Sequence, residues 1–233
     1  MTLLLIHGLG VNSNIWGPLI SDLNQNIILV DLPGHGSSQD KAFGWEQMWT
    51  KIVKGLSSKK SVDCTLVLHS FSAALMPEIV ESGFKFKKII LLEGILHADD
   101  LGWSKGMEGI EEGEFSQWLS RFRAVSEMAL KSQLVAKHDI HSLFMWSEGF
   151  RSTSGNAMRT MASNLIKRLH SNVIEQSLCR TVSPVVFFRG EQSRLGLPGR
   201  QLLEACNVPV IEIPNSGHFP MLDNPAGLYQ AMR

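Results

Sequence analysis

The chain has 233 residues, 44% of them hydrophobic and 19% charged, which suits one globular domain or a core that carries an insertion. Lys and Arg balance Asp and Glu at 22 each, so the net charge indicates neither a nucleic-acid partner nor an anionic membrane surface. The opening stretch MTLLLIHG has too few apolar residues for a signal peptide or a membrane span, and no longer run follows. A cytoplasmic protein is therefore expected.

Short apolar runs predict six strands. They lie at residues 3–6, 27–30, 66–68, 89–92, 185–188 and 208–213. Continuous apolar runs without polar alternation are typical of strands covered on both faces. Amphipathic stretches of helical length lie between the early runs, at residues 15–23, 45–56 and 71–81. Strands that alternate with helices predict an α/β fold with a mostly parallel sheet and crossover helices. The first strand is expected at an exposed edge of this sheet, where it could pair with a second copy of the chain.

The strand pattern stops between residues 97 and 180, where helical patterns at 114–135 and 155–170 take over. We predict a core formed by residues 1–96 and 181–233 and a helical cap formed by residues 97–180. Large apolar side chains of this cap are expected mostly to pack, with a few lining an apolar substrate pocket; the candidates are Trp103, Trp118, Met145 and Trp146. The cap also carries a run of basic residues, Arg151, Arg159, Lys167 and Arg168. A solvated helix face is the preferred interpretation of this run, and a dock for a phosphate-bearing acyl carrier is the alternative.

The cysteines and histidines show no metal-ligand spacing. Cys64, Cys179 and Cys206 lie far apart, so they are expected to be buried as free, small apolar side chains in a reducing cytosol. The eight histidines are scattered and none shows HExxH spacing. Neither a metal nor an organic cofactor is expected.

One serine stands at the end of a predicted buried strand, in the stretch TLVLHSFSAAL. A strand-to-helix turn would expose the Ser70 hydroxyl above the sheet and leave backbone N–H groups free to stabilise an oxyanion. Such a turn is crowded: Ser72 and Ala73 fit the need for small residues, whereas Leu68 departs from the G-x-S-x-G form. Taken alone, Ser70 could be a nucleophile or an N-cap residue.

Three further segments favour the nucleophile. HGLG follows the first strand, DLPGHGSS follows the second, and PNSGHFPMLDNP places His218 in a loop after the last strand. With Trp16, LHSFSA and PVVFFRGE, these segments resemble the α/β-hydrolase family in order and spacing, over residues 2–96 and 184–230. The resemblance is closest to small esterase-type members, including pimeloyl-carrier methyl ester esterases, and to the menaquinone-pathway lyase of the same fold.

This resemblance implies roles for individual residues. Ser70 would be the nucleophile and His218 the general base, with the N–H groups of Leu9 and Phe71 as the oxyanion hole. The substrate would also be bordered by core residues next to these motifs: His7, Gly8, His69 and Phe219.

The acid that supports the histidine is missing from its usual place, which is occupied by Ser193. Glu93, Glu191 and Asp223 are the candidates, and Glu93 is preferred because it ends the strand next to that of Ser70. Glu93→Gln is then expected to lower the rate by orders of magnitude, and Ser193→Ala to do little.

The preferred function is a carboxylic ester hydrolase that cleaves an ester or thioester with an apolar acyl group through an acyl-enzyme. The substrate is a small molecule, and a carrier-linked methyl ester such as a pimeloyl-carrier methyl ester is one candidate. The alternatives are a lyase or C–C bond hydrolase of the same fold, and a binding or receptor protein with vestigial catalysis. The oligomeric state stays open.

Overall fold

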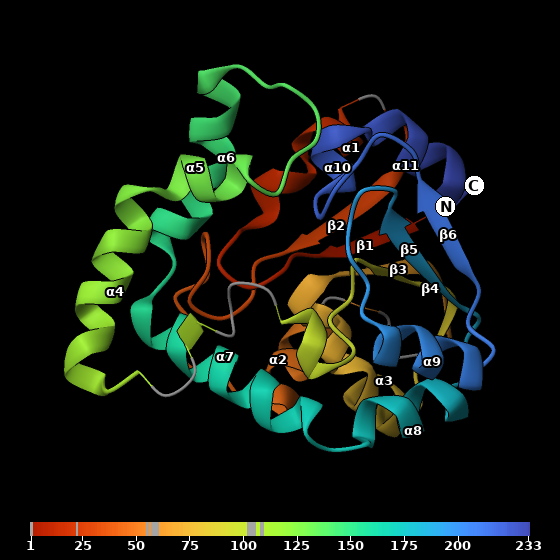
Figure 1. Ribbon diagram of the computed structural model, residues 1–233. Coiled ribbons are helices and arrows are strands. Elements are labelled where there is room, and N and C mark those ends of the chain that lie inside the picture. The colour runs from red at the N-terminus through yellow and green to blue at the C-terminus, as the bar shows by residue number, and fades with distance from the viewer. Residues whose placement is uncertain (1, 22, 55, 57–60, 102–105, 108–109) are drawn as a thin grey trace.

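Six parallel strands form one sheet in the computed structural model, which describes residues 2–21, 23–54, 56, 61–101, 106–107 and 110–233 (Figure 1). The strands are β1 (Thr2–Ile6), β2 (Asn26–Val30), β3 (Ser61–His69), β4 (Lys85–Leu92), β5 (Val185–Gly190) and β6 (Val210–Ile213). Their order is β2-β1-β3-β4-β5-β6, and every neighbouring pair is parallel. The predicted α/β fold with a parallel sheet is confirmed.

Both faces of the sheet are covered, which explains why the strands are continuously apolar. Leu4 and Leu66 point to one core, whereas Leu3 and Val67 point to the other, as the twofold period of a strand requires. The core-domain helices are α1 (Gly17–Ile20), α2 (Trp45–Val53), α3 (Met76–Ser82), α9 (Leu197–Ala205), α10 (Pro220–Asp223) and α11 (Pro225–Met232). In Figure 1, α1, α10 and α11 gather on one side of the sheet and α2, α3 and α9 on the other. Three 3-10 helices, η1 (Ser13–Trp16), η2 (Ser70–Leu75) and η3 (Ala98–Asp100), follow strand ends or lead into the next helix.

The long segment between β4 and β5 is helical wherever the structure describes regular elements in it. Its α-helices are α4 (Glu112–Ala124), α5 (Ser126–Lys131), α6 (Ile140–Ser152), α7 (Gly155–Leu169) and α8 (Val173–Arg180). The side chains of Asp139 and Ser154 accept hydrogen bonds from the first turns of α6 and α7, so ordinary N-caps start these helices. In Figure 1, α4, α5 and α6 stand away from the sheet, whereas α7 and α8 run below it toward α9.

The first strand does not lie at an edge. β1 pairs with β2 on one side and with β3 on the other, so the edges are β2 and β6, and the expectation of an exposed first strand was wrong. The reason is the crossover order, which places the second strand outside the first. The sequence shows which segments are strands but contains no local signal for their order in the sheet.

Two of the three cysteines are bonded to each other. Cys179, in α8, forms a disulfide with Cys206, which directly follows α9, and their Cα atoms lie 4.6 Å apart. The expectation of three free thiols was therefore wrong for this pair, because the packing of α8 near α9 brings distant positions together. Disulfides persist mainly in oxidising compartments. The bonded pair therefore means that the cysteines no longer argue for a location in a reducing cytosol. Cys64 is free and buried, as predicted, and burial raises the pKa of its thiol to about 11. No helix in the described ranges is long and apolar enough to cross a membrane.

Candidate active site

Ser70 lies at the tip of a sharp turn between β3 and η2. Its φ of 55° is in the left-handed region, which a residue with a side chain adopts only when its surroundings enforce it. The strand ends at His69 with extended backbone, and the chain turns at once into the helical segment Ser70–Leu75. The predicted helix at 71–81 thus starts with this 3-10 turn and continues as α3.

Glycines of neighbouring strands relieve the crowding at this turn. A Cβ on Gly94 would lie 2.7 Å from Cβ of Ala73, and one on Gly8 would lie 3.0 Å from Cβ of Ser70. In the G-x-S-x-G form, glycines on either side of the serine keep this space free. Here Gly8 and Gly94, which follow β1 and β4, do so instead. Leu68 fits because its side chain is fully buried in the core on one face of the sheet.

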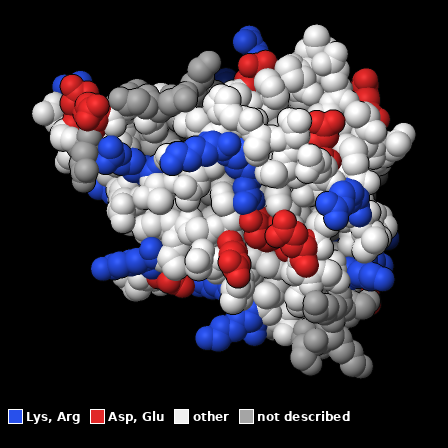
Figure 2. Space-filling view, turned by 90° about the horizontal axis from the view of Figure 1, so that it is seen from below, with Lys and Arg blue, Asp and Glu red and all other residues white. Residues whose placement is uncertain are grey.

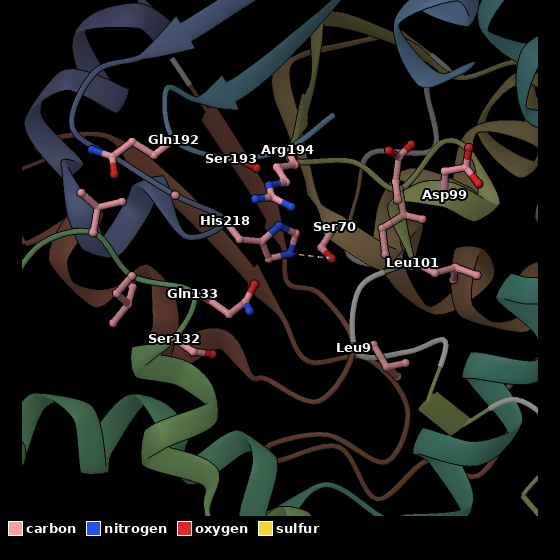
Figure 3. Close-up of a pocket in the computed structure, with 15 residues that line it drawn as sticks. Leu9, Ser70, Asp99, Leu101, Ser132, Gln133, Gln192, Ser193, Arg194 and His218 are labelled. Carbon is pink, nitrogen blue, oxygen red and sulfur yellow. Dashed lines mark hydrogen bonds between the residues drawn. The ribbon is translucent and has the colours of Figure 1, made fainter. Parts of the chain in front are cut away.

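His218 reaches Ser70 from the loop after β6. Its Nε2 atom lies 3.1 Å from Oγ of Ser70, and Figure 3 shows the two side chains facing each other across the floor of a cavity. The His69 ring lies beside the His218 ring, 5.1 Å between centroids, and His69 Nε2 is 2.9 Å from the His218 carbonyl oxygen. Since a carbonyl only accepts, His69 donates this bond from its Nε2–H and holds the backbone that carries the second imidazole.

Glu93 contacts the other nitrogen of His218. The residue follows β4 directly, and its φ of 53° turns the chain sharply just as at Ser70. Its Oε2 atom lies 3.3 Å from Nδ1 of His218 and also accepts a hydrogen bond from the Ser193 hydroxyl, while Oε1 accepts from the Gly190 N–H at 2.5 Å. With a carboxylate at Nδ1, His218 carries its proton there and presents a free Nε2 to Ser70.

The other two candidate acids have different partners. Glu191 is exposed and accepts from the Asn215 N–H at 2.9 Å. Asp223 has a buried side chain that accepts from the Gly217 N–H and from the N–H groups of Val135 and Ala136, each at 2.9 Å. Asp223 thus joins the histidine loop to the cap segment before α6.

The oxyanion hole predicted from the sequence uses the backbone N–H groups of Leu9 and Phe71. Leu9 lies in the loop after β1 and lines the same cavity as Ser70. Phe71 is in the first turn of η2, where backbone N–H groups have no partner within the helix. The oxyanion hole itself stays a prediction.

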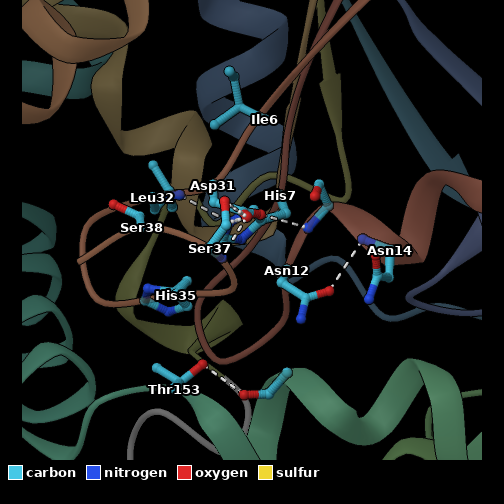
Figure 4. A network of polar contacts seen from close by, with 12 residues as sticks. Ile6, His7, Asn12, Asn14, Asp31, Leu32, His35, Ser37, Ser38 and Thr153 are labelled. Atoms are coloured by element: carbon cyan, nitrogen blue, oxygen red, sulfur yellow. Dashed lines mark hydrogen bonds and ion pairs between the residues drawn. The ribbon is translucent and has the colours of Figure 1, made fainter. Parts of the chain in front are cut away.

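Buried neutral histidines support the Leu9 loop. The Gly10 N–H donates to Nε2 of His35, and the Leu32 N–H donates to Nε2 of His7, so both imidazoles must be unprotonated at that nitrogen. Burial lowers the pKa of His7 to about 4 and that of His35 to about 3. Figure 4 shows how this network closes on Asp31. Burial would raise the Asp31 pKa, but N–H donors of Ser37 and Ser13 outweigh it and lower that pKa.

A cavity of about 540 Å³ opens above Ser70 and His218. Its lining comes from several parts of the chain: Leu9, Ser70, the segment Ile95 with Asp99–Leu101, the cap segment Ser132–Val135, the segment Gln192–Arg194, and Gly217 with His218. One part of this wall is apolar and another carries amide, carboxylate and guanidinium groups, so the cavity is only partly apolar.

None of the predicted substrate-contacting residues that the structure describes is among those lining the cavity, although some lie beside Ser70 and His218. Trp118 stacks between two phenylalanines of α4, Trp146 packs edge-on against His138, and Met145 is exposed on α6. In the core, His7 supports the oxyanion loop, Gly8 gives the serine its space, and His69 and Phe219 pack around the His218 ring. Trp103 lies outside the described residues.

Sequence reasoning missed the polar residues of the cavity wall, among them Asp99, Gln133, Gln192 and Arg194. These residues belong to loops without periodicity, so no hydrophobic pattern points to them. One signal was available: Gln192 and Arg194 flank Ser193, at the position where the family's acid was sought.

The basic run on the cap is largely engaged in internal contacts. Arg168 forms a two-pronged ion pair with Glu78, at 2.6 and 2.7 Å, and lies over the Trp45 ring. Arg151 pairs with Glu127 at 2.8 Å, and Arg159 lies over the Phe115 ring. Lys167 is exposed. Figure 2, seen from the side where α7 and α8 lie in Figure 1, shows basic and acidic side chains interspersed rather than one continuous basic patch.

The described residues contain no group of three or more His, Cys, Asp and Glu side chains arranged to hold a metal ion. A serine on a strand-to-helix turn of a parallel sheet, facing a histidine from a late loop, is the arrangement of the hydrolase class predicted from the sequence. Residues 3–231 match the model of the alpha/beta hydrolase family, and the chain belongs to this family.

Curated relatives cover nearly the whole chain. A pimeloyl-[acyl-carrier protein] methyl ester esterase of Nitrosomonas europaea is 24% identical over 235 residues, covering 96% of this chain and 90% of the relative. A protein of the same name from Nitrosospira multiformis is 25% identical, covering 96% of this chain and 89% of the relative.

Solved structures agree on the fold. An esterase from Exiguobacterium antarcticum superposes with a TM-score of 0.76 at 14% identity, covering all of this chain and 90% of that one. A thermophilic esterase from Thermogutta terrifontis superposes with a TM-score of 0.75 at 17% identity, covering all of this chain and 88% of that one. The predicted family is confirmed, and the predicted class of carboxylic ester hydrolase is confirmed by the curated relatives, which are named methyl ester esterases.

Proposed function

We propose that the chain hydrolyses carboxylic esters or thioesters through an acyl-enzyme on Ser70. The observation that carries the proposal is the relay of two contacts, 3.1 Å from Ser70 Oγ to His218 Nε2 and 3.3 Å from His218 Nδ1 to Glu93 Oε2. Both distances are within or just beyond the range of an active nucleophile and its base in an unliganded enzyme.

The reaction follows from these contacts. His218 takes the Ser70 proton as the hydroxyl oxygen attacks the carbonyl carbon, and the N–H groups of Leu9 and Phe71 stabilise the oxyanion. Glu93 stabilises the imidazolium, which then protonates the leaving alcohol or thiol. Water, deprotonated by His218, attacks the acyl-enzyme, and the acid product leaves with Ser70 restored.

The segment 97–180 acts in this proposal as a cap. Its loop Ser132–Val135 forms one wall of the cavity, and Asp223 attaches that loop to the loop of His218. The cap thus takes part in enclosing the substrate and in holding the general base. The apolar wall, which includes Leu9 and Leu134, suits an aliphatic acyl chain.

The finer candidate substrate is a carrier-linked methyl ester. It is supported by the names of the two curated relatives, which are 24% and 25% identical to this chain. The pairing of Arg151 and Arg168 with acidic side chains gives no support to a free basic dock for the carrier.

The test is active-site labelling combined with turnover. A fluorophosphonate probe is expected to label the protein at Ser70, and a series of p-nitrophenyl esters of increasing chain length is expected to be hydrolysed with a burst of p-nitrophenol. Ser70→Ala should abolish both signals and still unfold cooperatively in urea. Absence of labelling and of ester turnover in the folded wild-type protein would refute the proposal in favour of a binding protein.

A further inference from the structure

Arg194 is the cation that lines the cavity of the proposed reaction centre among the residues that the structure describes. Arg194 follows Ser193 shortly after the end of β5 and lines the cavity that holds Ser70 and His218. A second void of about 20 Å³, room for roughly one water molecule, is bordered by Arg194 together with Glu93, Asp100 and His218. Figure 3 shows the Arg194 guanidinium beside the His218 ring.

The Arg194 guanidinium forms no ion pair, hydrogen bond or ring contact with any residue that the structure describes. Arg194 is exposed, whereas Arg168 pairs with Glu78 and Arg189 pairs with Glu212 at 2.6 Å. A guanidinium presents five N–H donors in a planar fork that matches a carboxylate, so Arg194 is free to bind one.

The acidic side chains of the same cavity have other partners. Asp100 accepts a hydrogen bond from the Gly196 N–H at 2.7 Å, and burial raises its pKa, which disfavours its negative charge. Asp99 lies 3.6 Å from Nδ1 of His97. Neither carboxylate neutralises Arg194, although all three residues line one wall or another of the same space.

We infer that Arg194 forms an anion subsite for the substrate, so that the preferred esters carry a carboxylate a few bonds from the scissile carbonyl. The inference rests on the proposed function, because it names the class of ester that the Ser70 centre takes. The amides of Gln133 and Gln192, which line the cavity as well, add neutral hydrogen-bonding groups around such a carboxylate.

The position of Arg194 predicts an effect on rate as well as on binding. His218 becomes positively charged during acylation, and a nearby guanidinium that forms no direct ion pair with a described residue opposes that charge. A substrate carboxylate bound to Arg194 neutralises the guanidinium and lowers this penalty. Anionic esters should therefore gain in kcat and not only in KM.

The experiment compares matched anionic and neutral esters. Monomethyl succinate and monomethyl glutarate carry the carboxylate on the acyl side, O-acetyl lactate carries it on the alcohol side, and the corresponding dimethyl esters and methyl O-acetyl lactate are neutral. The wild-type protein should prefer the anionic member of at least one pair in kcat/KM, and the pair that shows this preference identifies the side of the substrate that Arg194 binds.

Arg194→Gln should lower the ratio of anionic to neutral kcat/KM about tenfold or more, and Arg194→Lys should keep part of it because the charge remains. High ionic strength should reduce the same ratio in the wild-type protein. Arg121→Gln is the matched control: Arg121 is exposed on α4 and outside the cavity lining, so its ratio should equal that of the wild type.

The outcomes separate the two proposals. If the esters are hydrolysed but Arg194→Gln leaves the ratio unchanged, the subsite is refuted and the hydrolase stands. If no ester is hydrolysed, calorimetry with free succinate and glutarate still decides the subsite, since binding by the wild type that is lost in Arg194→Gln supports it and absence of binding refutes it.

Discussion

Replacing Glu93 by Gln tests the proposed relay most directly, because the structure fixes how the new amide must lie. The Gly190 N–H points at Oε1 of Glu93, so the oxygen of the introduced amide has to occupy that place. The NH₂ group then occupies the place of Oε2, facing Nδ1 of His218. As a donor, it favours the tautomer of His218 that carries its proton on Nε2 and cannot accept the proton of Ser70.

The expected loss in kcat is about 10³- to 10⁴-fold, the size found when the acid of such a relay becomes an amide, or about 4 to 5.5 kcal/mol in the activation free energy. The assay is the steady-state hydrolysis of p-nitrophenyl acetate, with urea unfolding measured in parallel. The fold should persist, because the amide keeps the shape of the carboxylate and its bond to Gly190.

The double variant Glu93→Gln with Ser193→Asp provides a rescue. The Ser193 hydroxyl contacts the Oε2 atom that faces His218, so a carboxylate at position 193 comes within reach of the same imidazole. Activity should recover by about tenfold or more over the single variant. The reasoning is refuted if Glu93→Gln stays within tenfold of the wild type, or if Glu191→Gln, the matched control on an exposed acid, shows the larger loss.

Three further predictions concern the supports of the site. Ser193→Ala was expected from the sequence alone to do little. The structure instead predicts that it lowers kcat about tenfold, because it removes a hydrogen bond to the charged Glu93. A pH–rate profile separates this effect from a general loss of fold. Cys206→Ser should destabilise the protein by about 3.5 kcal/mol, as chain entropy predicts for a sequence separation of 27, so an unchanged thermal midpoint after reduction of the disulfide would contradict a structural role for it. His7 and His35 have pKa values of about 4 and about 3 in the folded protein, below the unfolded value of 6.5, so between these values the unfolded chain binds more protons than the folded one. The free energy of unfolding should therefore fall as pH drops below about 6.5, by about 1.4 kcal/mol per pH unit for each histidine. Urea unfolding measured over this pH range should show a smaller slope of that free energy against pH for His35→Gln than for the wild type.

The proposed reacting groups could be predicted from the sequence because Ser70 and Glu93 directly follow apolar runs, His218 lies in the loop after the last run, and the motifs around them resemble the family. In a parallel sheet all such ends meet at one edge, so Ser70, Glu93 and His218 were expected together before any coordinates. Glu191 also follows a strand end, so this rule alone does not separate it from Glu93; the preference for Glu93 came from its place on the strand next to that of Ser70 and from the resemblance to the family. In the structure, Glu93 is the one of the three whose carboxylate lies 3.3 Å from Nδ1 of His218. Its role in catalysis stays a prediction until the variants are measured.

The cavity wall could not be predicted in the same way. Apolar periodicity reports that a helix face is buried, but not what it is buried against, and Trp118 stacks on its own helix instead of facing the substrate. The wall comes from aperiodic loops whose position depends on how the cap packs on the core. Ser193 illustrates the limit: local sequence shows that it cannot carry charge, whereas only the fold shows that it holds the carboxylate that does.

The sequence by itself thus determined the α/β fold, the family and the residues that meet above the sheet, because strand ends and tight turns follow from short-range sterics and burial. Only the tertiary structure decided the strand order, the Cys179–Cys206 disulfide and the exposure of Arg194 to the cavity. These features depend on contacts between segments far apart in the chain, and such contacts leave no mark in the spacing of residues.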